Sequence, residues 1–179
     1  MGERVADQIA GLAARLGLPR FVDVCSDLLA GAPREQYVEE LRELTGAAWE
    51  PGDRLFDRAR WGDFWVRSWG ARGLLHVWHD SATPSIIAGL GDEHYRPAEM
   101  CLKVATRHEV AGTGDGAAAL AAHDLPRVRA QALRCLAAMG DTEHAAVVEA
   151  ALADADVVVR RQAERAQAAL VLRLDLESR

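Results

Sequence analysis

The sequence predicts an all-α fold, an α-solenoid of stacked antiparallel helix pairs. The stretch that starts at Val128 recurs in related form downstream, from Val159, and upstream, from Val66. The three copies share the form Val-Arg-x-(Gln/Trp)-small-x-Arg-small. Apolar residues recur at helical spacing throughout, and Gly, Pro and Asp punctuate the segments. A fixed period of about 30 residues in a helix-forming sequence is typical of helical repeat arrays.

The first 46 residues predict helices that cap the array. Apolar positions follow helical spacing over residues 3–16, 19–30 and 33–45, with charged residues on the opposite sides. The glycines that end these three segments are Gly17, Gly31 and Gly46. Residues 47–61 are less regular. They predict a turn at residues 51–53 and a short helix over residues 53–60.

The remaining chain predicts paired helices. A helix capped by Asp63 is expected to reach residues 78 or 79. Because the interval from Val66 to Val128 is twice that from Val128 to Val159, a degraded fourth copy of the motif should lie between the first two. The best match aligns Ala98 and Cys101 with Ala132 and Cys135, which requires a longer loop over residues 112–116. The further helices are expected over residues 81–90, 117–122, 126–139, 143–153 and 157–174.

Each unit is thus a helix, a tight turn containing Asp, and a second helix that starts near Val-Arg. Such a pair cannot bury its apolar side alone, so the pairs should stack on one continuous core. The units resemble HEAT repeats of the short PBS-lyase type, over about residues 50–174. The second unit departs from the pattern, with Tyr95-Arg96-Pro97 in place of Val-Arg, and the N-terminal residues do not match it.

The resemblance implies a right-handed α-solenoid of four to five units whose second helices line a concave, partner-binding surface. We therefore expect a single domain over residues 1–179, with capping helices over 1–46 and the HEAT-like array over 47–179. Asp and Arg near the turns commonly pair in such families, which predicts structural ion pairs; an anion-binding row is the alternative. The residues expected to form these pairs are Asp63, Arg67, Asp124, Arg129, Asp156 (or Asp154) and Arg160.

A further stripe on the second helices is the candidate partner-binding surface. Its members lie at spacing i, i+4 and i+7, which places each set on one side of its helix. Trp and Arg often dominate protein interfaces. The expected binding residues are Trp65, Trp69, Arg72, His76, Gln131, Arg134, Gln162 and Arg165. The alternative is that Trp65 and Trp69 form core beneath the capping helices and that the arginines are solvated.

The composition narrows the possible partners. A net charge of −6 argues against a dedicated binder of nucleic-acid backbone. The three cysteines show no Cys-x-x-Cys spacing and are expected to be reduced core residues, which favours a cytoplasmic protein. No apolar run is long enough to span a membrane, and the N-terminus does not resemble a secretion signal.

Known catalytic patterns are missing from the sequence. His76 and His79 lie at i, i+3, but no further ligands join them, so we expect no metal and no cofactor. The glycine-rich stretch at 112–116 lacks the Lys-Ser/Thr ending of a phosphate loop. No catalytic residue is therefore assigned.

We therefore expect a non-enzymatic scaffold or adaptor that binds a protein or peptide along the concave face. The alternative is a nucleic-acid-binding or DNA-repair protein resembling the alkyl-purine DNA glycosylases built on HEAT-like repeats. A lyase or a chaperone for a prosthetic group follows only from analogy of fold. The sequence leaves the oligomeric state open.

Overall fold

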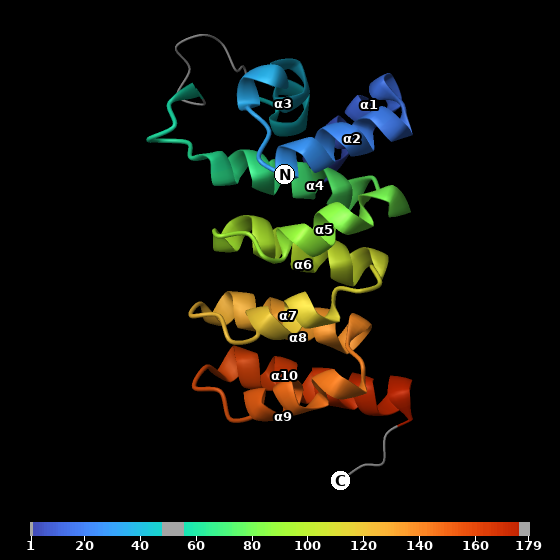
Figure 1. Ribbon diagram of the computed structural model, residues 1–179, viewed down its shortest axis with the longest axis vertical. Helices are drawn as coiled ribbons and strands as arrows, with labels where there is room; N and C mark the ends of the chain where they lie inside the picture. The colour runs from blue at the N-terminus through green and yellow to red at the C-terminus, as the bar shows by residue number, and fades with distance from the viewer. Residues whose placement is uncertain (1, 48–55, 176–179) are drawn as a thin grey trace. The chain divides into compact units, whose positions relative to one another are not determined.

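The computed structural model describes residues 2–47 and 56–175, and within these ranges the chain is all-α (Figure 1). The described residues form ten α-helices and three short 3-10 helices, and they contain no strand. This confirms the predicted all-α fold. The turn expected at 51–53 lies outside the described residues, and residues 57–60 form a turn rather than the end of a helix. The chain divides into two compact units, Met1–Met100 and Cys101–Arg179.

The N-terminal unit packs its first helices on the helix that carries the first motif copy. Helix α2 packs against α4, and α1 packs against α2 and α3. Gly17, with φ of +77°, joins α1 to α2, and Gly46 ends α3 in the left-handed region. The elements of this unit are α1 (Gly2–Leu16), α2 (Leu18–Leu29), η1 (Arg34–Gln36), α3 (Val38–Thr45), α4 (Asp63–His76), η3 (Asp80–Ala82), α5 (Thr83–Gly89) and the first part of α6 (Tyr95–His108).

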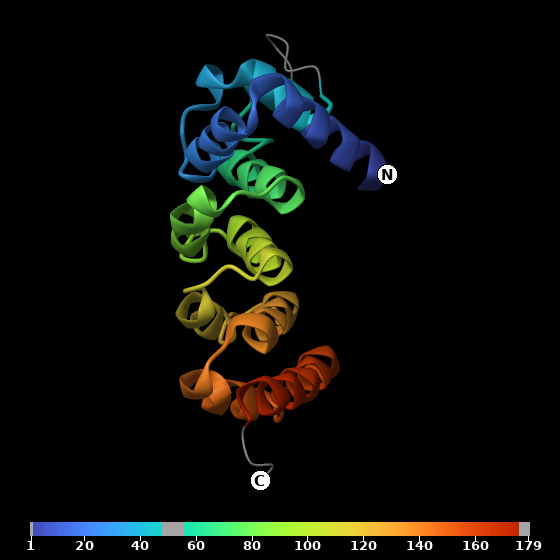
Figure 2. The same ribbon diagram turned by 90° about the vertical axis from the view of Figure 1, so that its right-hand side faces the viewer.

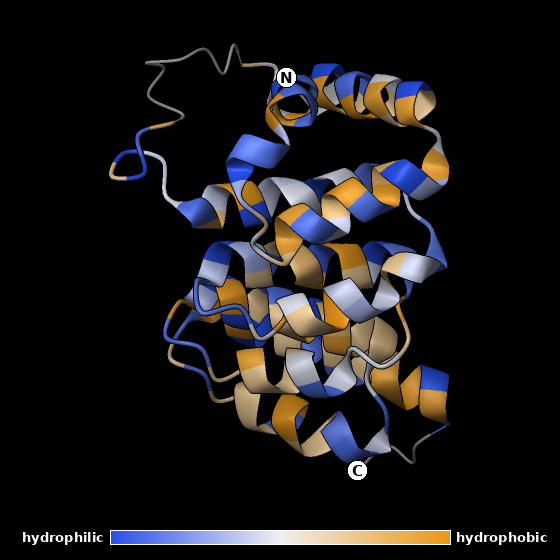
Figure 3. Cartoon of the chain, turned by 45° about the horizontal axis from the view of Figure 1, so that its top comes forward, coloured by the Kyte–Doolittle hydropathy of each residue, from blue (hydrophilic) through white to orange (hydrophobic). Residues whose placement is uncertain are grey.

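In the C-terminal unit, short first helices alternate with long second helices. Helix α8 packs against α7 and α10, and α10 packs against α9. Figure 2 shows α7 and α9 on one side of this unit and α8 and α10 on the other. Its elements after α6 are α7 (Gly114–Leu120), α8 (Pro126–Met139), η4 (Thr142–His144), α9 (Ala145–Ala151) and α10 (Val157–Leu174). Apolar and polar residues alternate around these helices, as expected for amphipathic segments (Figure 3).

The helix boundaries keep one constant period, the same as that of the sequence motif. Helices α5, α7 and α9 begin at Thr83, Gly114 and Ala145, and α6, α8 and α10 begin at Tyr95, Pro126 and Val157. This spacing is consistent with a helical repeat. The longer loop predicted over residues 112–116 is wrong, because Gly114 already starts α7. Core residues recur about once per turn along a helix. An alignment of two repeats that is displaced by three residues therefore still matches small core residues with small core residues.

The buried positions of the second helices follow the same period. At three positions per helix the residues are small or β-branched, with proline once, and all twelve are buried, which permits close packing. Cys101 and Cys135 belong to this set and Cys25 is buried on α2, so the cysteines are core residues as predicted. The twelve are Val66, Pro97, Val128 and Val159; Gly70, Cys101, Ala132 and Ala163; and Gly73, Val104, Cys135 and Ala166.

None of the described helices is both long and apolar enough to span a bilayer.

Helix α4 differs from the other second helices because it has glycine where they have Ala, Cys or Val. A Cβ on Gly70 would lie 2.5 Å from the carbonyl oxygen of Cys25 and 2.7 Å from the amide nitrogen of Leu29. A Cβ on Gly73 would lie 2.4 Å from Cys25 Sγ. The two glycines therefore allow the backbone of α4 to approach α2.

Gly70→Ala is expected to destabilise the protein by about 2 kcal/mol or more, because the added methyl group meets backbone atoms of α2 that cannot rotate away. Gly11→Ala is the matched control. Gly11 lies in α1 with open space around its Cβ position, so this change should stabilise the helix by about 0.5–1 kcal/mol. Urea unfolding monitored by circular dichroism measures both. Equal effects for the two variants would contradict the close approach of α4 and α2.

Candidate binding surface

Two bidentate ion pairs join second helices to the turns that follow them. Arg67 donates from Nε and Nη2 to Asp92 at 2.6 and 2.9 Å, and also approaches Glu93. Arg129 donates from Nε and Nη2 to Asp154, both at 2.7 Å. In each pair the carboxylate lies 25 residues after the arginine. The first arginine of the motif therefore reaches forward to the next turn, not back to the preceding one.

The aspartates that precede these helices have other contacts. Asp63 accepts a hydrogen bond from the buried guanidinium of Arg34 and lies near Arg58, and these cations lower the pKa of its carboxyl. Asp124 is exposed and offers its backbone carbonyl to Arg129. Asp156 caps α10 by accepting the backbone N–H of Val158 at 2.7 Å. These residues fix turns and helix starts.

Among the described residues, Arg160 of the last unit finds only backbone acceptors. Its Nη1 donates to the carbonyl oxygens of Asp154 and Ala155 at 2.7 and 3.0 Å. Arg129 makes the same contact with the carbonyls of His123 and Asp124. Arg129 and Arg160 thus hold the turns that precede their own helices through carbonyl groups, and Arg129 also holds the next turn through Asp154.

The ion pair is replaced at both ends in one copy of the repeat. Asp92, His123 and Asp154 occupy the same position of successive repeats, and each accepts the backbone N–H two residues ahead. His123 keeps this turn contact through Nδ1 at 2.9 Å but has no carboxylate. The residue that matches Arg67 in the next repeat is Ala98. The two changes occur together, so neither leaves an unpaired charge.

Substitution at the Arg129–Asp154 pair is expected to cost stability. We expect Arg129→Gln to destabilise the protein by about 1–2 kcal/mol, because the pair is bidentate and its side chains are only 16% and 14% exposed. Asp154→Asn keeps an acceptor for the turn, so the double-mutant cycle isolates the ion pair. Chemical denaturation of the four proteins at pH 7 gives the coupling energy. As a control, Arg161→Gln, at an exposed position of α10, should change stability by less than about 0.5 kcal/mol. A coupling energy near zero would show that the contact between Arg129 and Asp154 does not stabilise the fold.

Aromatic rings gather where α4 and α6 begin. The rings of Phe64 and His94 stack with centroids 3.8 Å apart, and His94 stacks on Tyr95 at 4.8 Å. Phe64 also contacts Trp65 at 5.3 Å, and Trp65 stacks on Trp61 at 6.5 Å. All five side chains are half-buried. They form a continuous, half-buried aromatic cluster within the N-terminal unit.

Two arginines cover the tryptophans of α4. The guanidinium carbon of Arg96 lies 4.4 Å from the Trp65 ring centroid, and that of Arg72 lies 5.0 Å from the Trp69 ring centroid. The four residues are half-buried, and Arg72 and Arg96 form no ion pair with any described residue. His76, half-buried, follows one turn after Arg72 on the same helix. Four predicted binding residues therefore share α4, and Arg96 joins them from α6.

The environment of His94 favours its neutral form. Burial lowers the pKa of the imidazole, and the positive charges of Arg96 and Arg67 act in the same direction, while Asp92 opposes them. Its Nδ1 accepts the backbone N–H of Arg96 at 3.2 Å. A protonated ring would lose this acceptor. His94 therefore holds the start of α6 only while it is neutral.

Acidification is expected to weaken the N-terminal unit before carboxylates titrate. A folded-state pKa below the ordinary 6.5 means that the unfolded chain binds the proton more tightly. The contribution of His94 is complete above about pH 6.5 and is lost as the pH falls through the folded-state value. Urea unfolding between pH 7.5 and 5 should show this loss. His94→Asn keeps a capping acceptor without titrating, so its stability should fall less over the same range; identical pH profiles would contradict the assignment.

In the C-terminal unit, the predicted binding residues separate into buried and exposed positions. Gln131 and Gln162 are only 6% and 8% exposed, whereas Arg134 and Arg165 are exposed. Arg134 donates from Nη1 to Gln131 Oε1 at 3.0 Å and from Nε to Gln162 Oε1 at 3.3 Å. The glutamines therefore lie beneath Arg134, and the surface itself is formed by the arginines.

The constant repeat register adds a residue that sequence reasoning missed. Arg72, Arg134 and Arg165 stand at one repeat position, and Lys103 is the residue at that position in α6. The alignment of the second unit from sequence was displaced by three residues, so Lys103 did not align with these arginines. The four second helices carry twelve Arg or Lys residues and only three Asp or Glu, although the whole chain has a net charge of −6. Basic charge is thus concentrated on these helices.

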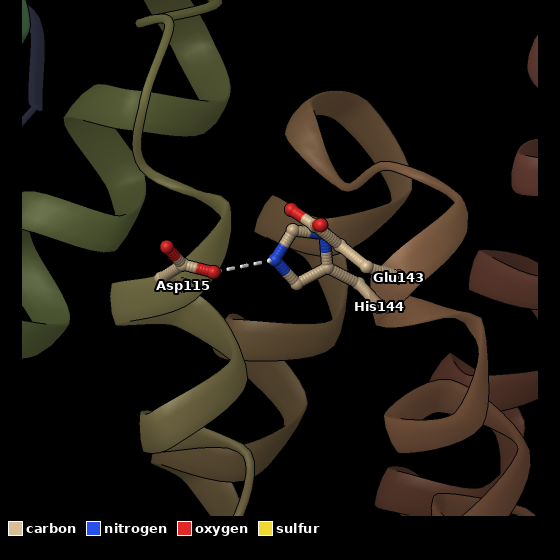
Figure 4. A group of neighbouring side chains, drawn as sticks. All are labelled: Asp115, Glu143 and His144. Atoms are coloured by element: carbon tan, nitrogen blue, oxygen red, sulfur yellow. Dashed lines mark hydrogen bonds and ion pairs between the residues drawn. The ribbon is translucent and has the colours of Figure 1, made fainter.

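One group of side chains in the C-terminal unit could suggest a metal site. Asp115, Glu143 and His144 place one potential ligand atom each within 4.8 Å of one another, and His144 Nε2 lies 3.1 Å from Asp115 Oδ1 (Figure 4). However, His144 Nδ1 accepts the backbone N–H of Asp141 at 2.8 Å. A neutral imidazole with an acceptor Nδ1 carries its proton on Nε2, which donates to Asp115 and cannot bind a metal.

His144 therefore has a structural role. Its buried ring packs on the start of α7, where a Cβ on Gly114 would lie 2.6 Å from the ring carbon Cε1. His79, one of the two histidines that the sequence suggested as metal ligands, accepts the backbone N–H of Ser81 through Nδ1 at 3.2 Å. Both histidines hold backbone groups at the starts of short helices.

No family model matches the chain, and no curated protein sequence matches it either.

Proposed function

We propose that this protein is a non-enzymatic binding module that holds an acidic segment of a partner protein against its second helices. In the N-terminal unit the contact residues are Trp65, Trp69, Arg72 and Arg96. The observation that carries the proposal is that Arg72 and Arg96 lie over the rings of two half-buried tryptophans without a carboxylate partner among the described residues. His76 extends the same face of α4.

The chemistry of a stacked arginine suits a carboxylate ligand. A guanidinium that lies on an indole ring keeps its N–H groups at its edge, where they can form two parallel bonds to a carboxylate. The tryptophan supplies apolar area beside the charge and limits the rotamers of the arginine. Trp and Arg together often contribute most of the affinity at protein interfaces. The acidic remainder of the chain repels acidic partners elsewhere and so favours this face.

The arginines of the second helices fall into two groups, those with a carboxylate partner and those without one, and this contrast supports the proposal. Those two arginines are satisfied by Asp92 and Asp154. The arginines five residues further along the second helices, Arg72, Arg134 and Arg165, have no carboxylate partner among the residues that the structure describes. A stable fold that leaves selected cations uncompensated suits a protein whose partner supplies the negative charge.

The wider assignment follows from the repeat. We propose a right-handed α-solenoid resembling the short HEAT repeats, in which second helices line the concave face that receives the partner. The unpaired, buried state of Cys25, Cys101 and Cys135 is compatible with a reducing compartment such as the cytoplasm.

Nucleic acid is the second candidate partner. The excess of Arg and Lys over Asp and Glu on the second helices favours it, and tryptophan beside arginine also suits an unstacked base. The net charge of −6 opposes it. The two candidates differ in salt dependence, because the release of counterions from a nucleic-acid backbone makes binding fall steeply with added salt.

The test uses intrinsic tryptophan fluorescence and labelled ligands with the full chain. Fluorescein-labelled decaglutamate should bind and should alter tryptophan emission, while decalysine should not. Arg72→Gln combined with Arg96→Gln should weaken decaglutamate binding, as read from tryptophan emission, at least tenfold, with a thermal unfolding midpoint within about 2 °C of the unmodified protein. The matched control is Arg161→Gln with Arg165 retained, which should change affinity less than twofold.

Equal binding of decaglutamate by the double variant and the unmodified protein would remove the α4–α6 surface from consideration. Tighter binding of a labelled DNA duplex than of decaglutamate, with a steep salt dependence that the double variant reduces, would favour the nucleic-acid alternative.

A further inference from the structure

Arg134, on α8, is held in place by two buried amides. Its Nη1 and Nε donate to the Oε1 atoms of Gln131 and Gln162, at 3.0 and 3.3 Å. Gln131 lies one turn before Arg134 on α8, and Gln162 comes from α10, which packs against α8. Both glutamines are more than nine-tenths buried, while Arg134 itself is exposed. The guanidinium is therefore fixed at the surface from two helices.

The polar groups of this cluster that remain available for a ligand are all hydrogen-bond donors. A guanidinium has only donors, so each amide turns its oxygen toward Arg134 and its Nε2 group away from that contact. Among the described residues, neither Nε2 group nor Arg134 Nη2 has a hydrogen-bond acceptor. What Arg134, Gln131 and Gln162 can still offer to a ligand is N–H alone. An oxyanion is the ligand class that accepts from several such donors at once.

The charge of the cluster is also left intact. On the same helix, Arg129 is neutralised by Asp154. Amide oxygens orient Arg134 from two helices, but they carry no formal charge. Arg165 lies one turn after Gln162 on α10, about 5–6 Å away between Cβ atoms, and it forms no ion pair with any described residue. A second cation thus lies beside the first.

We propose that Arg134, Gln131 and Gln162, with Arg165 at their edge, form an oxyanion-binding site in the C-terminal unit that takes a carboxylate of an acidic segment. The site rests on the proposed function, since it receives the same class of ligand as the α4 surface. Phosphate shares this chemistry and could occupy the same donors. Preorganisation by buried amides distinguishes the site from a solvated arginine, because less side-chain entropy is lost on binding.

The test is an NMR titration of the full chain. It follows the side-chain signals of the two glutamine Nε2 groups and of Arg134 Nε as decaglutamate or, separately, inorganic phosphate is added. The decisive variant is Gln162→Glu. It keeps the shape and the acceptor of Gln162 but neutralises Arg134 internally, so the fold is retained while ligand affinity should fall at least tenfold. Arg134→Gln should have the same effect, and Arg161→Gln, which removes an exposed charge from α10 outside the cluster, should change affinity less than twofold.

Shifts of the glutamine and Arg134 signals that saturate with decaglutamate, and that Gln162→Glu abolishes, support the site. Saturation by phosphate alone would assign the site to phosphate and overturn the carboxylate ligand. Binding of both probes that is unchanged in Gln162→Glu and Arg134→Gln, or no shift at all in the unmodified protein, would overturn the site. All five tryptophans precede residue 101. Tryptophan fluorescence therefore tests the α4 surface separately, and either result can fail alone.

Discussion

The bidentate contact between a second-helix arginine and the aspartate of the next turn orients the helices that carry the proposed binding surface. Arg67 and Arg129 each hold the turn that follows, and the same aspartates fold that turn by accepting a backbone N–H. The start of the next second helix is therefore fixed by an ionised pair. The same contact directs one face of α4 and of α8 toward that turn and so sets the phase of these two helices: Arg72 and Arg134, five residues beyond Arg67 and Arg129, lie on a different face.

This phase explains why arginines of similar sequence context have different roles. The first arginine of the motif points to a turn and is neutralised there. The second points away from the turn, and its neighbours are uncharged: an indole ring beneath Arg72 and two amide oxygens beneath Arg134. Tryptophan and glutamine occupy one repeat position, Trp69 and Gln131, and both orient a guanidinium without cancelling its charge. A chain with a net charge of −6 thereby maintains basic helix faces.

The helices and their period could be predicted from the sequence because apolar spacing and glycine stops are local signals. The ion-pair partners could not, because proximity in sequence favoured Asp63 and Asp124, whereas the structure uses the next turn. Lys103 was missed for a related reason: small core residues repeat at each helical turn, so an alignment based on Ala98 and Cys101 slipped by three positions. The burial of Gln131 and Gln162 depends on how α8 packs on α10, which no local pattern reveals.

The glycines of α4 limit how such a repeat protein can change its length. Gly70 and Gly73 fit α4 to α2 at a distance that Ala132, Cys135 or their counterparts in α10 could not match. Duplication of a later unit would therefore produce a copy unable to take the position of α4 against α2. A unit gained or lost after α4 would leave this junction unchanged. Two missing methyl groups thus specify the place of α4, and the tryptophan-bearing surface that α4 carries stays next to α2 whatever the number of units that follow.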